Sequence, residues 1–354
     1  MPFWCVGNPL ADPFGGPVLQ KIDSLEVARL IAEAKQQGWI EETAYHDDDL
    51  VPWDPEHPED DLDPKSAAYE KLHAIKQILD NAGVTVNSSV CSLHGNPIFR
   101  DGGLCNPDPH VRELARLKVQ RTLRLGQFFG AKHYIYWVAR DGFEVPVVTQ
   151  WGKVYEWLAE GLNGVTDYIR KNGMANYVGA TIEPKPNEPR GQMFLPTAGH
   201  AVGFICQKLK EPDFWGVNPE LLQHEGMALM NSVLTVAYLV SMGKLKFLHF
   251  GSQIKAQFDD DFPPLVGPEG LKETVLMFYT LKKLGWKGVV EFDCHMLRAE
   301  ADLEAQLETR RQFIRNCSEA LDIALALADR IQEPASGRNQ SAADLDCIRQ
   351  ICQL

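Results

Sequence analysis

The segment 181–189, Thr-Ile-Glu-Pro-Lys-Pro-Asn-Glu-Pro, places charged side chains of opposite sign directly after an apolar run. Its prolines fix φ at about −65° and bias the preceding residues away from helix, so the chain leaves the run as a stiff, extended loop. Glu183 and Lys185 are two residues apart and therefore point to the same side. A carboxylate and an ammonium held in this way are typical of a metal ligand beside an electrophile, the alternative being a solvated surface loop.

Further polar groups follow other short apolar runs. His46 precedes Asp49 by three positions, which suits an imidazole with an orienting carboxylate. Trp4 and Trp137 also follow apolar runs, where aromatic side chains could form the walls of a sugar pocket or simply belong to the core.

Four consecutive runs each deliver a carboxylate or an imidazole. These four residues are Glu183, Glu220, His249 and Asp293. An oxygen-rich set with one imidazole suits Mg²⁺ or Mn²⁺, with Co²⁺ also possible. Strand alternation places Glu291 on the same face as Asp293. Glu220 and His224 would share one face of a helix opened by Pro219 and could bridge a metal, unless they lie on an exposed first turn.

These residues need elements that bring them together. The apolar runs predict strands near 2–6, 40–46, 84–91, 132–138, 177–183, 214–218, 245–250 and 288–293. Amphipathic segments predict helices near 24–37, 64–82, 108–129, 152–173, 198–210, 221–242, 268–284 and 300–331. Eight alternations predict an α/β fold, a (β/α)₈ TIM barrel, in which chemistry gathers at the carboxyl ends of the strands. A doubly wound sheet is the alternative, but no Gly-rich dinucleotide turn follows the first run.

Length and composition set further limits. The 354 residues suit one large barrel over 1–331, followed by a linker and a short C-terminal helix over 332–354 that could contact another subunit. A net charge of −13 argues against nucleic-acid and anionic-membrane partners. The eight cysteines form no CxxC pair, which is typical of reduced thiols in a cytoplasmic protein. We find no signal peptide and no membrane-spanning run.

Several motifs, taken together and in order, make the chain similar to the class I xylose (glucose) isomerases over nearly the whole barrel. The matching segments are 12–15, 46–50, 97–103, 183–191, 195–200 and 216–220. The resemblance implies that His46, oriented by Asp49, assists opening of a cyclic sugar, and that Lys185 hydrogen-bonds the carbonyl oxygen.

The resemblance also implies a first metal on Glu183, Glu220 and Asp293, and a second, mobile metal near Glu220 and His224. Together they would support a 1,2-hydride shift on a free, xylose- or glucose-like monosaccharide. Trp4 and Trp137 would form apolar pocket walls. Phe14 would reach the site of a neighbouring subunit, which implies a homodimer or homotetramer.

The sequence departs from the family pattern at several of these positions. His249 stands where the family has an aspartate ligand, and His94 stands at an aromatic position of the pocket wall. Gln257 and Asp259 align with two aspartates of the second-metal loop, so one carboxylate is lost and binding of a second hard cation should weaken. The number of ions per chain therefore stays at one or two.

These departures leave three functional hypotheses. The first is a metal-dependent aldose–ketose isomerase that uses a hydride shift. The second is a single-metal keto-sugar isomerase or epimerase, in which Glu183 and Asp293 shuttle a proton through an enediolate. The third is a barrel that binds sugar or metal without catalysis, which the intact His46, Asp49 and Lys185 disfavour.

Overall fold

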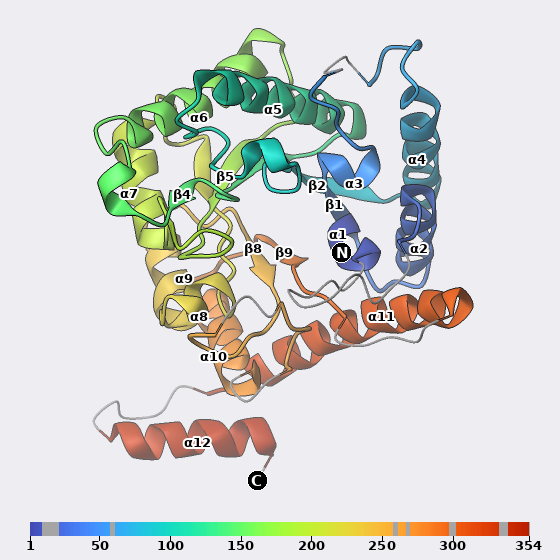
Figure 1. Ribbon diagram of the computed structural model, residues 1–354. Helices are drawn as coiled ribbons and strands as arrows, with labels where there is room; N and C mark the ends of the chain where they lie inside the picture. The colour runs from blue at the N-terminus through green and yellow to red at the C-terminus, as the bar shows by residue number, and fades with distance from the viewer. Residues whose placement is uncertain are drawn as a thin grey trace.

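The structure is a computed structural model that describes residues 1–8, 21–56, 61–257, 261–266, 270–296, 302–332 and 339–353. Helices surround a central group of parallel strands, as the barrel prediction requires (Figure 1). One sheet contains, in spatial order, β1 (Glu42–His46), β2 (Thr85–Val90), β3 (His133–Trp137), β5 (Gly179–Glu183) and β7 (Trp215–Val217). A second parallel pair contains β8 (Phe247–Phe250) and β9 (Val289–Phe292).

Two isolated parallel bridges join the two sheets. Val217 pairs with Leu245, and Glu220 pairs with His249. The sheet therefore continues from β7 to β8, and its carboxyl edge carries Glu183, Glu220, His249 and Asp293 side by side. This is the (β/α)₈ architecture, with the four candidate ligand residues at the strand ends.

The outer helices follow the strands in the predicted order. They are α2 (Ser24–Gln36), α4 (Tyr69–Ala82), α5 (Pro109–Phe129), α6 (Val154–Lys171), α7 (Ala198–Lys208), α9 (Ser232–Ser241), α10 (Gly270–Lys283) and α11 (Leu303–Ala328). Asp108 caps α5 by accepting from His110 N, and Pro109 occupies its first turn. Gly83 and Gly130 end α4 and α5 in the left-handed conformation that glycine adopts most readily. A short antiparallel pair, β4 (Gly142–Phe143) with β6 (Gln192–Met193), lies outside the parallel sheets.

The prediction of a first strand at 2–6 is wrong, because Phe3–Gly7 form helix α1. A five-residue apolar run has no periodicity that separates strand from helix. The helical turn buries Phe3, Cys5 and Val6 in the core. Met1 still meets β1, since its amine donates to Glu42 O and its carbonyl accepts from Thr43 Oγ1. On the other side, the Cys5 thiol donates to Phe292 O of β9.

As a result, α1 stands between β9 and β1. Among the described strands, β9 is paired only with β8 and β1 only with β2. Arg310 of α11 fixes this helix, because its buried guanidinium donates to Val6 O and, at 3.3 Å, to Asn8 O. A cation beside carbonyls at a helix C-terminus is a favourable arrangement.

The single helix predicted over 221–242 is also wrong. The chain instead forms α8 (His224–Met227) and α9, separated by Leu229 with φ of 59° and by Asn231, which caps α9 by accepting from Leu234 N. At the far end of the chain, α12 (Gln340–Cys352) lies outside the ring of barrel helices (Figure 1). Asp344 of α12 pairs with Lys272 of α10. No helix in the described part of the chain has the length and apolarity to cross a membrane.

Candidate metal and sugar site

Four buried ligand-type side chains converge at the carboxyl edge of strands β5 to β9. One ligand atom from each of Glu183, Glu220, His249 and Asp293 lies within 4.8 Å of the other three. These are the four residues that the strand-end pattern singled out. The set offers three carboxylates and one imidazole, which is a donor set for a divalent cation.

His249 is at the centre of this cluster. Its Nδ1 lies 2.9 Å from Asp293 Oδ2, 3.3 Å from Glu183 Oε2 and 3.8 Å from Glu220 Oε1. The opposite ring nitrogen, Nε2, lies 3.1 Å from Glu291 Oε1. One edge of the imidazole therefore faces the ligand cluster and the other faces the barrel interior.

The electrostatics of the cluster favour a cation. Burial, offset only in part by His249, raises the pKa of Glu183 to about 8. Burial also raises the pKa of Glu220. Burial opposes protonation of His249, but Glu183 and Asp293 outweigh it and raise its pKa well above the ordinary value. The metal-free cluster thus holds protons, which a divalent ion would displace, leaving ionised carboxylates and a neutral imidazole as its ligands.

Glu220 and His224 meet, although not on one helix. Glu220 lies in the bridge to His249, and His224 begins α8. His224 Nε2 is 2.7 Å from Glu220 Oε2, and its Nδ1 is 3.9 Å from Glu183 Oε1. Residues 221–223 form a turn instead of continuing a helix, and Glu225 N donates to Glu220 O at 3.0 Å, so a local turn brings the two side chains together. His224 therefore lies beside the four-residue cluster.

His46 and Asp49 form a local pair at the end of β1. Asp49 Oδ2 accepts from His46 N at 2.8 Å and lies 3.4 Å from His46 Nδ1. The two side chains close a capping box on the short helix α3 (Asp47–Leu50). Burial opposes the charged form of His46, but Asp49 outweighs it and raises the pKa of His46.

Helix α3 is held by a buried ionic cluster. Asp47 accepts from Lys118 and Arg121 of α5, and both cations also contact Asp48. Asp47 also accepts from Ser92 N at 2.8 Å after β2. Asp47 and Lys118 are completely buried, so the position of α3 is tied to the barrel wall.

Lys185 is buried at the mouth of β5. Its Nζ lies 3.9 Å from Glu188 Oε2 and 5.7 Å from the centre of the Trp137 ring. It lines the same cavity as Glu183, as the two-residue spacing predicts.

The cavity above the cluster has a volume of about 260 Å³. Trp4, His46, His94 and Trp137 form an aromatic wall, with ring centres 4.6 Å apart for Trp4 and His46 and 4.8 Å apart for His94 and Trp137. Burial lowers the pKa of His94 well below its ordinary value. His94 therefore contributes a neutral imidazole, which can both donate and accept a hydrogen bond, at an otherwise aromatic wall.

Two predicted site residues, Phe14 and Asp259, lie outside the described residues. Asn218, Asp261 and His295 lie near the cluster and were not predicted to take part in the site. Asn218 donates to Glu183 Oε2 at 3.0 Å. Asp261 and His295 line the cavity, and Asp261 accepts from Gln223 Nε2 at 2.8 Å. Asn218 could have been found as a polar residue at a strand end, whereas the loops of Asp261 and His295 give no periodic signal.

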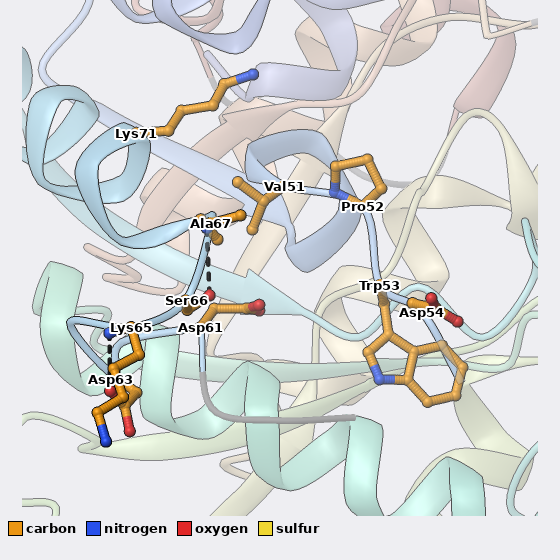
Figure 2. Close-up of a pocket in the computed structure, with 11 residues that line it drawn as sticks. Val51, Pro52, Trp53, Asp54, Asp61, Asp63, Lys65, Ser66, Ala67 and Lys71 are labelled. Carbon is orange, nitrogen blue, oxygen red and sulfur yellow. Dashed lines mark hydrogen bonds between the residues drawn. The ribbon is translucent and has the colours of Figure 1, made fainter. Parts of the chain in front are cut away.

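A larger cavity of about 750 Å³ lies elsewhere, between residues 51–54 and 61–71. Figure 2 shows Trp53 on one side of it and Lys71 on the other. It contains none of the predicted site residues. Size therefore does not identify the functional cavity here, and the chemistry of the lining side chains does.

Comparisons with known proteins agree with this geometry. A family model described as the xylose isomerase-like TIM barrel matches residues 46–317. The xylose isomerase of Thermus thermophilus is 33% identical over 340 residues, which cover 96% of this chain and 82% of that protein.

Solved structures show the same fold at low sequence identity. An L-ribulose 3-epimerase gives a TM-score of 0.59 at 16% identity, over 87% of this chain and 92% of that one. A D-allulose 3-epimerase from Methylomonas sp. gives a TM-score of 0.60 at 12% identity, over 86% and 93%. At these identities the likeness concerns the fold.

Proposed function

Because the chain belongs to the xylose isomerase-like TIM-barrel family, we propose that it is a metal-dependent aldose–ketose isomerase of a free monosaccharide. The observation that carries the proposal is one cavity lined by metal-ligand side chains, by the His46–Asp49 pair and by Lys185. The 33% identity to a xylose isomerase over nearly the whole chain supports the isomerase class. The natural sugar is xylose- or glucose-like in this proposal.

Glu183, Glu220, His249 and Asp293 would hold a divalent cation, Mn²⁺ or Mg²⁺ with Co²⁺ as a further candidate. Such an ion supplies Lewis acidity toward substrate oxygens and a template for them. His224, which contacts Glu220, would help to hold a second ion. The donor set fits this role, because three carboxyl groups and one imidazole are buried together within 4.8 Å and become ligands for such an ion when they are deprotonated.

The chain's own residues would then perform the acid–base and positioning work. His46, oriented by Asp49, would accept or return the proton of a ring hydroxyl when the cyclic sugar opens. Lys185 would donate a hydrogen bond to the carbonyl oxygen, where negative charge increases during the reaction. Trp4 and Trp137 would exclude water from the reacting carbons, which favours direct transfer over exchange with solvent.

A second candidate is proton transfer between two carboxylates, as in a keto-sugar isomerase or epimerase. One observation favours it: Glu183 and Asp293 approach the same imidazole nitrogen at 3.3 and 2.9 Å from different strands. Two carboxylates placed in this way could remove and return a proton on one substrate carbon.

The deciding experiment has two stages. Turnover is first measured on a panel of aldoses and ketoses with Mn²⁺, Mg²⁺ or Co²⁺, for the wild type, Lys185→Met and the exposed control Lys210→Met. Turnover that survives in Lys210→Met and falls at least about 100-fold in Lys185→Met supports a catalytic lysine. No turnover on any sugar with any metal would leave only the non-catalytic sugar- or metal-binding barrel.

The active sugar is then converted in heavy water. Product without deuterium at the transferred position supports the hydride shift. Deuterium at that position would reject it and favour the two-carboxylate alternative.

We also propose that the chain acts in the cytoplasm as a homodimer or homotetramer. All eight cysteines are unbridged, which suits a reducing compartment. The amphipathic α12 exposes Leu345 beyond the barrel and offers a contact surface. Light scattering on the purified chain tests the assembly, and a monomeric mass would reject it.

A further inference from the structure

Glu291 lies below the ligand cluster, inside the barrel, on the same strand face as Asp293. It is almost completely buried, with 3% of its surface exposed. Its Oε1 lies 3.1 Å from His249 Nε2. The carboxylate of Glu291 therefore contacts the ring nitrogen of His249 that faces away from Glu183 and Asp293.

The orientation of Glu291 is fixed by β2. Ser88 Oγ donates to Oε1 at 2.9 Å, and Asn87 Nδ2 donates to Oε2 at 2.7 Å. Asn87 Oδ1 is in turn 3.2 Å from His133 Nδ1 on β3. Both carboxylate oxygens thus have a donor from the far wall of the barrel, and Oε1 keeps a second acceptor direction toward His249.

This contact orients the ring of His249, with Nε2 toward Glu291 and Nδ1 toward the carboxylates of the cluster. A neutral imidazole carries one proton, and the nitrogen that keeps it is set by its hydrogen-bond partner. Asn218 Nδ2 is the competing neighbour of Nε2, but it lies 3.5 Å away and already donates to Glu183 at 3.0 Å. Glu291 is the closer group and is an acceptor, so it holds the hydrogen on Nε2. Without an ion, Asp293 at 2.9 Å is the acceptor for a hydrogen on Nδ1, and a bound ion would take the place of that hydrogen.

We propose that Glu291 is a positioning residue that keeps His249 protonated at Nε2, so that the Nδ1 lone pair is directed into the cluster of Glu183, Glu220 and Asp293. The inference rests on the proposed metal centre and adds to it a residue outside the four ligands. A carboxylate behind a ligating histidine fixes the ring and increases its basicity, and its loss typically weakens metal binding about 10- to 100-fold.

The test compares Mn²⁺ binding to chelator-treated protein by calorimetry and by electron paramagnetic resonance of the unbound ion. Glu291→Gln keeps the shape and removes the charge. Asp141→Asn is the matched control, because Asp141 is a buried carboxylate that accepts from Gly103 N and Tyr136 Oη and has no contact with the cluster. We expect binding to weaken about 10-fold or more in Glu291→Gln and to stay within about threefold of the wild type in Asp141→Asn.

A second readout reports on the tautomer itself. Nitrogen-15 NMR spectra are recorded on protein with labelled histidines in the presence of Mg²⁺. The signals of His249 are the ones that disappear in His249→Ala. The wild type should show a protonated Nε2 and an unprotonated Nδ1, and Glu291→Gln should show a mixture of the two forms. Where Glu291→Gln does not fold, Asn87→Leu, which removes the donor that fixes Oε2, should weaken Mn²⁺ binding about threefold or more by the same mechanism.

The outcomes separate the two proposals. Equal Mn²⁺ affinity of Glu291→Gln and the wild type, with binding lost in His249→Ala, would overturn the role of Glu291 and leave the metal centre standing. A wild type that binds no Mn²⁺ would overturn both.

Discussion

The indole Nε1 of Trp4 donates a 2.7 Å hydrogen bond to Oδ1 of Asp293. This bond links the first helix of the chain to the carboxylate that follows the last barrel strand. Asp293 thus has His249 at one oxygen and Trp4 at the other. Trp4 therefore belongs to the support of the ligand cluster as well as to the aromatic wall of the cavity.

Replacing Trp4 by phenylalanine should keep an aromatic wall and remove this hydrogen bond. A buried hydrogen bond to a charged acceptor contributes about 1.5–3 kcal/mol, so the free energy of unfolding of the metal-free protein should fall by that order. Urea denaturation measures it, with Trp151→Phe, an exposed tryptophan outside the cavity, as control. An unchanged denaturation midpoint in Trp4→Phe would contradict a stabilising role for the bond.

If the cluster of Glu183, Glu220 and Asp293 binds a cation as proposed, the cation should stabilise the fold, because it binds the folded chain only. At a Mn²⁺ concentration 100 times its dissociation constant, binding contributes about 2.7 kcal/mol. We therefore expect the melting temperature of chelated protein to rise on addition of Mn²⁺. The rise should be lost in His249→Ala and kept in His110→Ala, which changes an exposed histidine of α5. An equal rise in all three proteins would place the stabilising ion elsewhere.

The pH dependence of turnover should shift when Asp49 loses its charge. Asp49 raises the pKa of His46 against the effect of burial. If His46 acts as a base in ring opening, activity falls on the acid side as His46 becomes protonated. In Asp49→Asn that acid limb should move to lower pH, and the maximal rate should also fall because the ring loses its orientation. A limb that stays in place would assign it to another group.

Acid stability should depend on Asp47. Burial alone would raise its pKa, but Lys118 and Arg121 outweigh burial and lower it from 3.8 to about 2. Since the pKa is lower in the folded state, this stabilisation is complete above pH 3.8 and is lost as pH falls toward about 2.

The variant Asp47→Asn should lose the stability change in that pH window. It should also be less stable at pH 7 by about 3–5 kcal/mol, because Lys118 and Arg121 lose a buried partner. Circular dichroism against pH at fixed urea checks both effects, with the exposed Asp80→Asn as control. If the free energy of unfolding changed equally with pH in the wild type and Asp47→Asn between pH 4 and pH 2, the role of Asp47 in acid stability would be contradicted.

The sequence predicted the site better than it predicted some of the elements around it. Glu183, Glu220, His249 and Asp293 are far apart in the chain, yet a barrel brings all carboxyl strand ends to one rim. Their convergence therefore followed from topology alone. The 2–6 run carries no such information, because five apolar residues fit a buried strand or a helical turn equally well.

Contacts that depend on irregular turns or on facing strands were harder to predict. Glu220 and His224 were expected to meet through helical spacing, but they meet through a turn over residues 221–223. The Asn218 amide and the interior contact of Glu291 depend on side-chain directions across strands. Hydrophobic periodicity indicates which face of a strand or helix a residue occupies. It does not indicate which side chain of another strand that residue contacts across the barrel.

Helix α1 occupies the place expected for a strand, so the backbone hydrogen bonding of the barrel is interrupted between β9 and β1. We call this interruption the seam. Elsewhere the described strands are joined by backbone ladders or bridges, whereas β9 and β1 meet through the side chains and termini of residues 1–5. A joint of this kind opens at lower free energy than a continuous ladder, so amide exchange should begin there. Asp293 follows β9 on one side of this seam, and His46 ends β1 on the other side. Local opening of this joint would therefore change the spacing between two residues that line the cavity.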